Sequence, residues 1–170
     1  MIPEKHKEPI ERQRAVPPGI DKIVLFTLDE PCYGLPVSNI ERAIRAVEIT
    51  PLPRAPQAIL GIINMSGRII PVIDLRLRLR LPAKEMNCND QFLISRTFTR
   101  SVALIVDHVI GIREFPGGKI VNTENTLPFA EYLQGVAQLE DGLVLIYNLD
   151  HFLSLDEERE LDSALQGTKA

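Results

Sequence analysis

The chain has 170 residues, 45% of them apolar, which is enough for one domain with its own core. Its net charge of −4 and an aromatic content of 5% without tryptophan argue against nucleic-acid binding, which favours basic surfaces and aromatic platforms. No run approaches the ~18 apolar residues of a membrane span, so we expect no direct membrane insertion.

The first 20 residues are charged and rich in proline, and they contain no apolar stretch. Such a segment is unlike a signal peptide and has little to bury. We therefore predict a disordered N-terminal tail over residues 1–20, dispensable for folding, and a cytoplasmic protein.

Two strands and a short helix are predicted next. Residues 22–28 (KIVLFTL) are β-branched and aromatic, and residues 30–35 (EPCYGL) turn and begin a second strand. In residues 37–47, four apolar residues recur at helical spacing behind Ser38, which predicts a short capped turn of helix. Three prolines make residues 50–58 a connector.

A hairpin is predicted around Ser66 and Gly67. The apolar runs ILGIINM (59–65) and RIIPVID (68–74) flank this pair, and a two-residue connection of this kind is a strong hairpin signal. Gly67 should adopt a positive φ there, which a residue with a Cβ resists.

Residues 74–82 (DLRLRLRLP) allow two interpretations. In a strand, the leucines would line one face and the arginines the other. In a helix, Asp74 would be the N-cap, Pro82 would lie beyond the end, and the arginines would be mostly solvated charge. The period of so short a run does not decide between the two.

The rest of the chain predicts three more strands, a final hairpin and a terminal helix. The strands are QFLISRT, SVALIVD and residues 108–115, and the irregular residues 116–132 follow. The hairpin pairs LQGVAQL with GLVLIYNL around Glu140 and Asp141. Over residues 154–165, Ser154 and Glu157 form a capping box for a helix.

Short strands separated by turns, with only small helices, indicate an all-β fold of the barrel or sandwich type. Residues 59–75 also align with residues 133–149 at a constant offset of 74, so that Gly61 meets Gly135 and Asp74 meets Asn148. This echo predicts two related sub-barrels that each use the same hairpin.

No catalytic or metal-binding pattern emerges from the sequence. The three histidines and the cysteines Cys32 and Cys88 form no ligand or nucleophile spacing, and no phosphate-binding or hydrolase motif occurs. We expect no enzyme activity, no cofactor and no metal.

The segment YGLPVSNI, followed by GIINMSGRIIPVIDLRLRL, resembles the CheW family of chemotaxis coupling proteins. The shared features are a Tyr-Gly pair after the first strand, a glycine three residues before Asn64, Gly67, and an apolar-Pro-apolar run that ends in Asp-Leu-Arg. VALIVDHVIGI and YLQGVAQLEDGLVLIYNLDHFL resemble the later strand pair and the last hairpin of the family. The resemblance covers roughly residues 20–155.

The resemblance implies two five-stranded barrel-like halves (SH3-like or OB-like) around a shared core, over residues 21–154, followed by a C-terminal helix and tail over 155–170. It also favours the helix for residues 74–82. By the resemblance, the protein is a non-enzymatic adaptor recruited to receptor arrays at the inner membrane. It would couple the cytoplasmic hairpin tip of chemoreceptors (methyl-accepting chemotaxis proteins) to the regulatory domain of a CheA-type histidine kinase. An isolated β-barrel that binds a small ligand or nucleic acid is the alternative.

A groove between the two halves would suit the receptor tip, and we expect apolar residues to line it. The candidate partner-binding residues are Ile40, Arg42, Ile44, Asn64, Ser66, Arg68, Phe92 and Ala103. The candidate structural residues are Gly34, Gly61, Gly67 and Asp74.

Two positions depart from the family pattern. The family commonly carries arginine before the hairpin glycine, where this chain has Ser66 and places an arginine at 68 instead. Chemotaxis members often carry an acidic residue at the place of Arg42, although Glu41 adjoins it. A change of charge sign alters which surface can dock, so both positions bear on partner choice.

Overall fold

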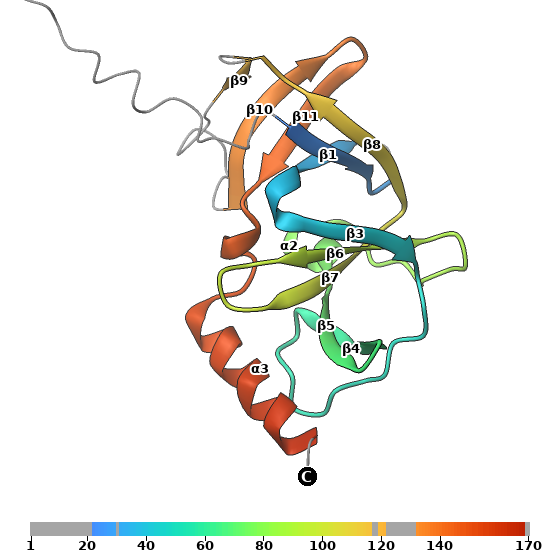
Figure 1. The fold of residues 1–170 in the computed structure, drawn as a ribbon, viewed down its shortest axis with the longest axis vertical. Coiled ribbons are helices and arrows are strands. Elements are labelled where there is room, and N and C mark those ends of the chain that lie inside the picture. Colours follow the sequence, from blue (N-terminus) through green and yellow to red (C-terminus); the bar gives the residue numbers. More distant parts are fainter. Residues whose placement is uncertain (1–21, 30, 117–118, 122–131, 169–170) are drawn as a thin grey trace, which may run out of the picture.

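The structure is a computed structural model that describes residues 22–29, 31–116, 119–121 and 132–168, so the predicted 1–20 tail lies outside the described residues. The described residues form two antiparallel-rich sheets, two short 3-10 turns and two helices (Figure 1). The strands are β1 (Lys22–Thr27), β2 (Cys32–Pro36), β3 (Ile40–Arg45), β4 (Ile59–Met65), β5 (Arg68–Ile73), β6 (Gln91–Arg96), β7 (Ser101–Val106), β8 (His108–Glu114), β9 (Ile120–Val121), β10 (Leu133–Leu139) and β11 (Gly142–Tyr147). The helical elements are η1 (Val37–Asn39), α2 (Leu75–Arg78), η3 (Leu149–His151) and α3 (Leu155–Thr168).

One sheet is built from strands near both chain ends, in the order β8-β1-β2-β11-β10-β9, and we call it the terminal sheet. The other, which we call the central sheet, has the order β3-β6-β7-β5-β4. Figure 1 shows the terminal sheet above the central sheet, and both views place α3 beside the central sheet. This is the predicted all-β architecture of two barrel-like halves, with β9 as a short sixth strand in the terminal one.

The two halves share one core because their strands alternate. Along β1, Val24 and Phe26 enter a large cluster that also contains Leu93 and Leu104 of the central sheet. The alternate residues Ile23 and Leu25 enter a separate cluster inside the terminal half. The central half has its own interior cluster, formed by Ile63, Ile70, Val72, Phe92, Ile94 and Ala103. Because side chains alternate between the two faces of a strand, the strands supply apolar residues to all three clusters.

The internal echo corresponds to a real equivalence between the halves. Both sheets contain a hairpin that joins its neighbour in parallel: β10–β11 beside β2, and β4–β5 beside β7. Both hairpins shift register at the matched glycines, between Ile59 and Gly61 and between Leu133 and Gly135. The capping residues correspond too, since Asp74 and Asn148 each accept a backbone N–H at the start of a helical turn.

Gly61 allows the central sheet to close. The chain after β3 returns to β4, where Thr50 and Ile62 exchange two backbone hydrogen bonds of 2.9 and 2.8 Å. A Cβ on Gly61 would lie 2.3 Å from the Thr50 carbonyl oxygen. At Gly135, a Cβ would similarly lie 3.0 Å from the carbonyl oxygen of Val121 in β9. Each matched glycine thus sits where a returning segment crosses the hairpin.

The helix predicted over residues 37–47 is wrong. Only η1 is helical, and Ile40–Arg45 forms β3, which pairs with β6. The apolar spacing fitted a helix, but pairing with β6 lets Ile40 and Ile44 lie against the cores from an edge strand. Tertiary contacts have overridden the local pattern here.

The predicted irregular stretch 116–132 is wrong at Ile120–Val121, which form the short strand β9 against β10, and most of its other residues lie outside the described ones. The remaining elements follow the sequence prediction. Both hairpins and the paired strands of residues 91–107 are present, and residues 108–115 contain β8. The α3 helix begins after the predicted capping box, in which the Glu157 N–H donates to Ser154 Oγ at 3.1 Å and the Ser154 N–H donates to Glu157 Oε1 at 2.9 Å. Residues 75–78 are helical, with Asp74 as N-cap accepting from the Leu77 N–H.

Candidate docking surfaces

The β4–β5 turn is exposed and tightly built. Ser66 has φ +54° and Gly67 has φ +88°, and the Gly67 N–H donates to Asn64 Oδ1 at 2.9 Å. A Cβ on Gly67 would meet nothing within 4 Å, so the strain of its positive φ, and not crowding, favours glycine there. The turn presents Asn64, Ser66 and Arg68 to solvent.

An ion pair joins this turn to the edge strand β3. The Arg68 guanidinium lies 3.3 Å from Glu41 Oε2 and donates to Ser101 Oγ at 2.7 Å, while Ser101 Oγ donates to Glu41 at 2.9 Å. Glu41 is the residue at which β3 bulges, since Ile40 pairs with Ser95 and Arg42 pairs with the adjacent Ile94. The hydrogen bond from Arg68 is the main reason why the pKa of Glu41 is lowered.

The predicted partner-binding residues fall into two groups. Arg42 is exposed on β3, and Ile40 and Ile44 are half-buried there, so this strand can contact a partner. Phe92 and Ala103 are fully buried inside the central half, where Ile44 packs against them. Their assignment to a groove lining is wrong, because the pleat of β6 and β7 turns both side chains into the barrel interior.

The predicted structural residues hold their expected places. Gly34 lies in β2, where a Cβ would come within 2.5 Å of Ile23 Cγ2, and Asp74 caps α2. Gly61 and Gly67 occupy the crossing and the turn described above.

The arginines of residues 74–82 are not mostly solvated, which corrects the expectation from the sequence. Arg76 is only 8% exposed and joins both halves of the molecule: its Nη1 lies 2.9 Å from Asp29 Oδ2, and its Nη2 lies 2.9 Å from Asp107 Oδ1. Asp29 follows β1 at positive φ, and its N–H donates to Asp107 Oδ2 at 2.7 Å. Arg78 pairs with Glu157 of α3.

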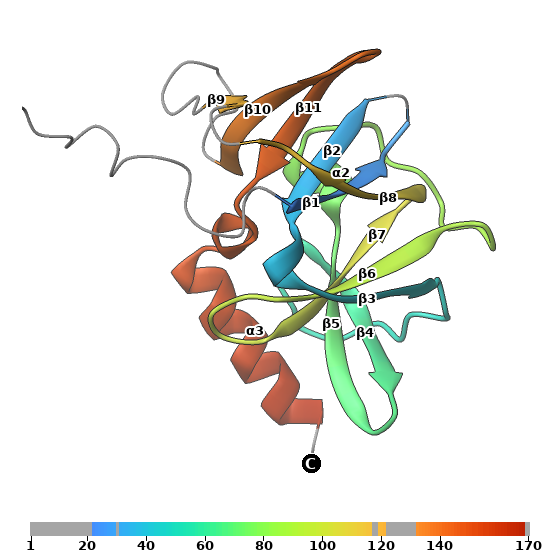
Figure 2. The ribbon, with the colours of Figure 1, turned by 45° about the horizontal axis from the view of Figure 1, so that its top comes forward.

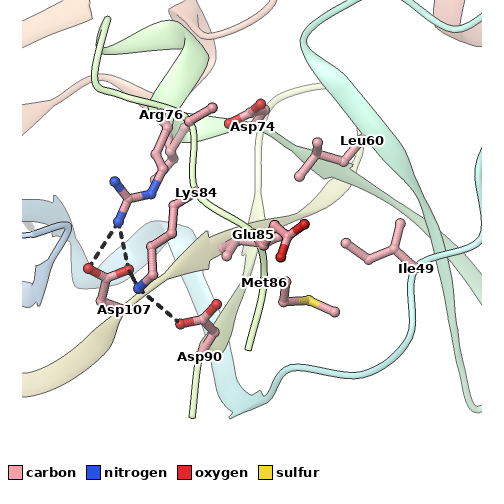
Figure 3. Close-up of a pocket in the computed structure, with 12 residues that line it drawn as sticks. Ile49, Leu60, Asp74, Arg76, Lys84, Glu85, Met86, Asp90 and Asp107 are labelled. Atoms are coloured by element: carbon pink, nitrogen blue, oxygen red, sulfur yellow. Dashed lines mark hydrogen bonds and ion pairs between the residues drawn. The ribbon is translucent and has the colours of Figure 1, made fainter. Parts of the chain in front are cut away.

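A pocket of about 380 Å³ opens beside this ion cluster. Figure 3 shows Arg76 and Lys84 directed at Asp107, with Lys84 also reaching Asp90, while apolar Ile49, Leu60 and Met86 occupy the opposite wall. Lys84 Nζ lies 3.3 Å from Asp107 and 3.8 Å from Asp90. Because both cations are paired, this pocket offers mainly apolar contact.

The sequence reasoning missed a second exposed surface, on the edge strand β8 of the terminal sheet. Ile110 and Ile112 are 54% and 64% exposed there. Their alternation with Val109 and Gly111 was the available signal, since the period of two in a strand predicts that Ile110 and Ile112 share one face, opposite to Val109. The two sheets therefore present different edges, β3 with charge and β8 with isoleucines.

Comparison with known proteins identifies the family. A sequence model described as the CheW-like domain matches residues 22–157, which include every described strand. The chain belongs to this family. Chemotaxis protein CheW of Rhizobium meliloti is 31% identical over 144 residues, covering 84% of this chain and 92% of that protein. Protein FrzA of Myxococcus xanthus is 30% identical over 131 residues, covering 76% and 81%.

The fold is also that of a solved CheW structure. The scaffolding protein TtCheW from Thermoanaerobacter tengcongensis superposes with a TM-score of 0.74 at 29% identity, covering 81% of this chain and 94% of that chain. In this CheW-like chain, the Glu41–Arg68 pair connects the segments that hold Arg42 and Ser66.

No helix within the described ranges is long and apolar enough to cross a membrane. The described part of the chain also holds no cluster of three or more histidine, cysteine or acidic side chains that could bind a metal ion.

Proposed function

We propose that this protein is a non-enzymatic adaptor that couples the hairpin tip of a chemoreceptor to the regulatory domain of a histidine kinase. The observation that carries the proposal is the match to the CheW-like domain across residues 22–157. Its relatives are chemotaxis proteins and FrzA, and a solved relative is described as a scaffolding protein. Recruitment to receptor arrays at the inner membrane is part of the same proposal.

An adaptor needs separate surfaces for separate partners, and the fold offers them. The edge strand β3 belongs to the central sheet and the edge strand β8 to the terminal sheet. Each edge leaves backbone donors and acceptors that a partner strand can pair with, and side chains that a partner helix can contact. The exposed Ile110 and Ile112 on β8 suit an apolar partner, whereas β3 carries Arg42 and Arg45.

The charge on β3 favours a partner with an acidic patch. Arg42 and Arg45 are exposed, and Glu41 on the same strand is paired with Arg68 of the turn. Charges at the rim of an interface act mainly on the association rate and on its salt sensitivity. This chain should therefore bind a partner whose docking surface is more acidic than the surface bound by a relative with a carboxylate at position 42.

Surface plasmon resonance with the full chain tests the proposal. The cognate receptor cytoplasmic fragment and the kinase regulatory domain are each passed over the immobilised protein, and then together. Binding of both at once supports an adaptor. Binding of neither, together with a mobility shift of an oligonucleotide at low salt, would favour the alternative of a nucleic-acid-binding barrel.

A further inference from the structure

The two most exposed large apolar side chains of the described residues lie on two elements that contact each other and belong to neither β3 nor β8. Phe98 is 91% exposed at the turn between β6 and β7 (residues 97–100), and Leu155 is 78% exposed in the first turn of α3. The Thr99 hydroxyl donates at 2.7 Å to Glu158 Oε2, one turn after Leu155 on α3. Figures 1 and 2 both show the β6–β7 turn beside the start of α3. We call this region the turn–helix surface.

The β6–β7 turn is held in one shape by its own hydrogen bonds. The Thr97 N–H donates to the Arg100 carbonyl oxygen at 2.8 Å, and the Thr97 hydroxyl accepts from the N–H groups of Thr99 and Arg100 at 3.2 and 3.1 Å. The Phe98 N–H donates to Asp150 Oδ1 at 2.8 Å. Phe98 is therefore presented on a fixed support, which lowers the entropic cost of binding through its ring.

These bonds also decide which kind of partner fits. The N–H groups of residues 97–100 all have acceptors within the molecule, so the turn offers no free backbone donor to an added strand. The backbone of α3 is engaged in its own helix. A partner therefore meets side chains here, as when the apolar face of one helix packs against another element.

The surroundings of Phe98 and Leu155 carry an excess of negative charge. Six carboxylates lie on α3 and beside the turn, whereas three arginines contact them. The carboxylates belong to Asp150, Asp156, Glu157, Glu158, Glu160 and Asp162, and the arginines are Arg78, Arg100 and Arg159. Each of these arginines is already paired, and the exposed Glu160 forms no ion pair within the described ranges. The surface therefore favours a cationic partner.

We propose that the turn–helix surface binds an amphipathic helix of a partner protein that carries lysine or arginine beside its apolar face. Phe98 and Leu155 contact the apolar face, and the basic side chains meet the carboxylates of α3. An anionic membrane surface fits less well, because the same carboxylates would repel it. The site is separate from the edges β3 and β8, and the proposal does not depend on the adaptor function.

Fluorescence anisotropy with the full-length protein and a labelled synthetic peptide tests this. The peptide is patterned from leucine and lysine as an amphipathic helix, and the matched peptide has glutamate in place of lysine. We expect saturable binding of the leucine–lysine peptide that weakens with added salt, and no binding of the leucine–glutamate peptide. Equal binding of both peptides, or binding of neither, would overturn the proposal.

Substitutions at exposed positions locate the site. Phe98→Ser should weaken binding of the leucine–lysine peptide about tenfold or more, the scale of a central aromatic contact, and Leu155→Ser should weaken it by a smaller factor. Ile112→Ser makes the same kind of change on β8 and should leave the affinity unchanged. Thermal unfolding of each variant checks that the fold is kept. If Phe98→Ser and Ile112→Ser bind alike, only the net charge of −4 attracts the peptide and the assignment of the site is wrong.

A charge reversal and the protein alone complete the test. Glu160→Lys should weaken peptide binding severalfold at low salt, whereas Glu85→Lys, an equal reversal at an exposed position beside the first pocket, should have little effect. Equal losses in the two variants would count against the site. Sedimentation of the protein without peptide should show no association through this surface. A self-association that Phe98→Ser abolishes would mean that a second copy, and not a basic helix, covers it.

Discussion

Arg76 donates from Nη2 to both carboxylate oxygens of Asp107, at 2.9 and 3.0 Å, and so fixes the end of β7 to the helix that follows β5. Through Nη1 it also holds Asp29, beside β1 in the terminal sheet. One side chain therefore links the two halves of the molecule. Because the Arg76 side chain itself is largely buried, removing it leaves Asp107 without its main partner.

Replacement of Arg76 by leucine should destabilise the protein by about 2–3 kcal/mol. This is below the ~3–5 kcal/mol cost of breaking a fully buried pair, because the Asp29 side chain is 47% exposed and Lys84 still faces Asp107. Urea unfolding of the variant and the wild type at neutral pH measures the difference. A change within the error of the method would mean that the cluster contributes no net stability.

The stability difference between wild type and Arg76→Leu should shrink in acid. Burial alone would raise the pKa of Asp107, but the hydrogen bond from the Asp29 N–H and the interactions with Arg76 outweigh it, and the pKa lies below the ordinary 3.8. A lowered folded-state pKa stabilises the protein above the unfolded-state pKa, and this contribution is lost as the pH falls through the folded-state value. Unfolding curves from neutral pH to below 3.8 check this, and a difference independent of pH would contradict it.

Gly67→Val should destabilise by roughly 1–3 kcal/mol, the scale of backbone strain at positive φ. Gly61→Val should cost more, because its side chain would also meet the Thr50 carbonyl oxygen in the strand crossing. Gly167→Ala within α3 is the control, since open space surrounds it and alanine favours a helix. Thermal unfolding ranks the three, and the opposite order for the first two would refute the role of the crossing.

Arg42→Glu should slow association with the native partner, and the loss should shrink as added salt brings the Debye length to ~8 Å. Surface plasmon resonance against the receptor fragment and the kinase domain measures the rate. Arg159→Glu is the matched charge reversal on α3, away from β3. If Arg42→Glu and the control behave alike at low salt, position 42 lies outside any interface.

A chain that starts at Gly19 should melt within a few degrees of the full-length protein, because residues 1–20 contain almost nothing to bury. Calorimetry of both chains tests this prediction. A large drop in the melting temperature would show that the N-terminal segment contributes to the folded core.

The sequence predicted those elements whose signals are local. Ser66-Gly67 selects its hairpin through backbone conformation alone, and Asp74 and Ser154 cap their helices through bonds that span three residues. The alignment of Gly61 with Gly135 could also be found in the sequence. Both glycines lie at equivalent strand crossings that leave no space for a Cβ.

Features that depend on distant partners were missed. Residues 40–45 carry apolar side chains at a spacing that suits a helix, and only pairing with β6 makes them a strand. The burial of Arg76 depends on Asp29 and Asp107, which lie 47 and 31 positions away in the chain. Phe92 and Ala103 were placed on a surface because an alternating strand does not reveal which of two packed faces lies inside a barrel.

The distribution of strands between the sheets has a consequence for the order of folding. The central sheet uses one continuous stretch of chain, from β3 to β7, whereas the terminal sheet joins β1 and β2 to strands that begin at His108. During synthesis, the central sheet can close while the ribosome is still producing the last third of the chain. The β1 residues that face the terminal core, Ile23 and Leu25, must wait uncovered for β10 and β11. The high sequence separation of these contacts makes this closing step slow.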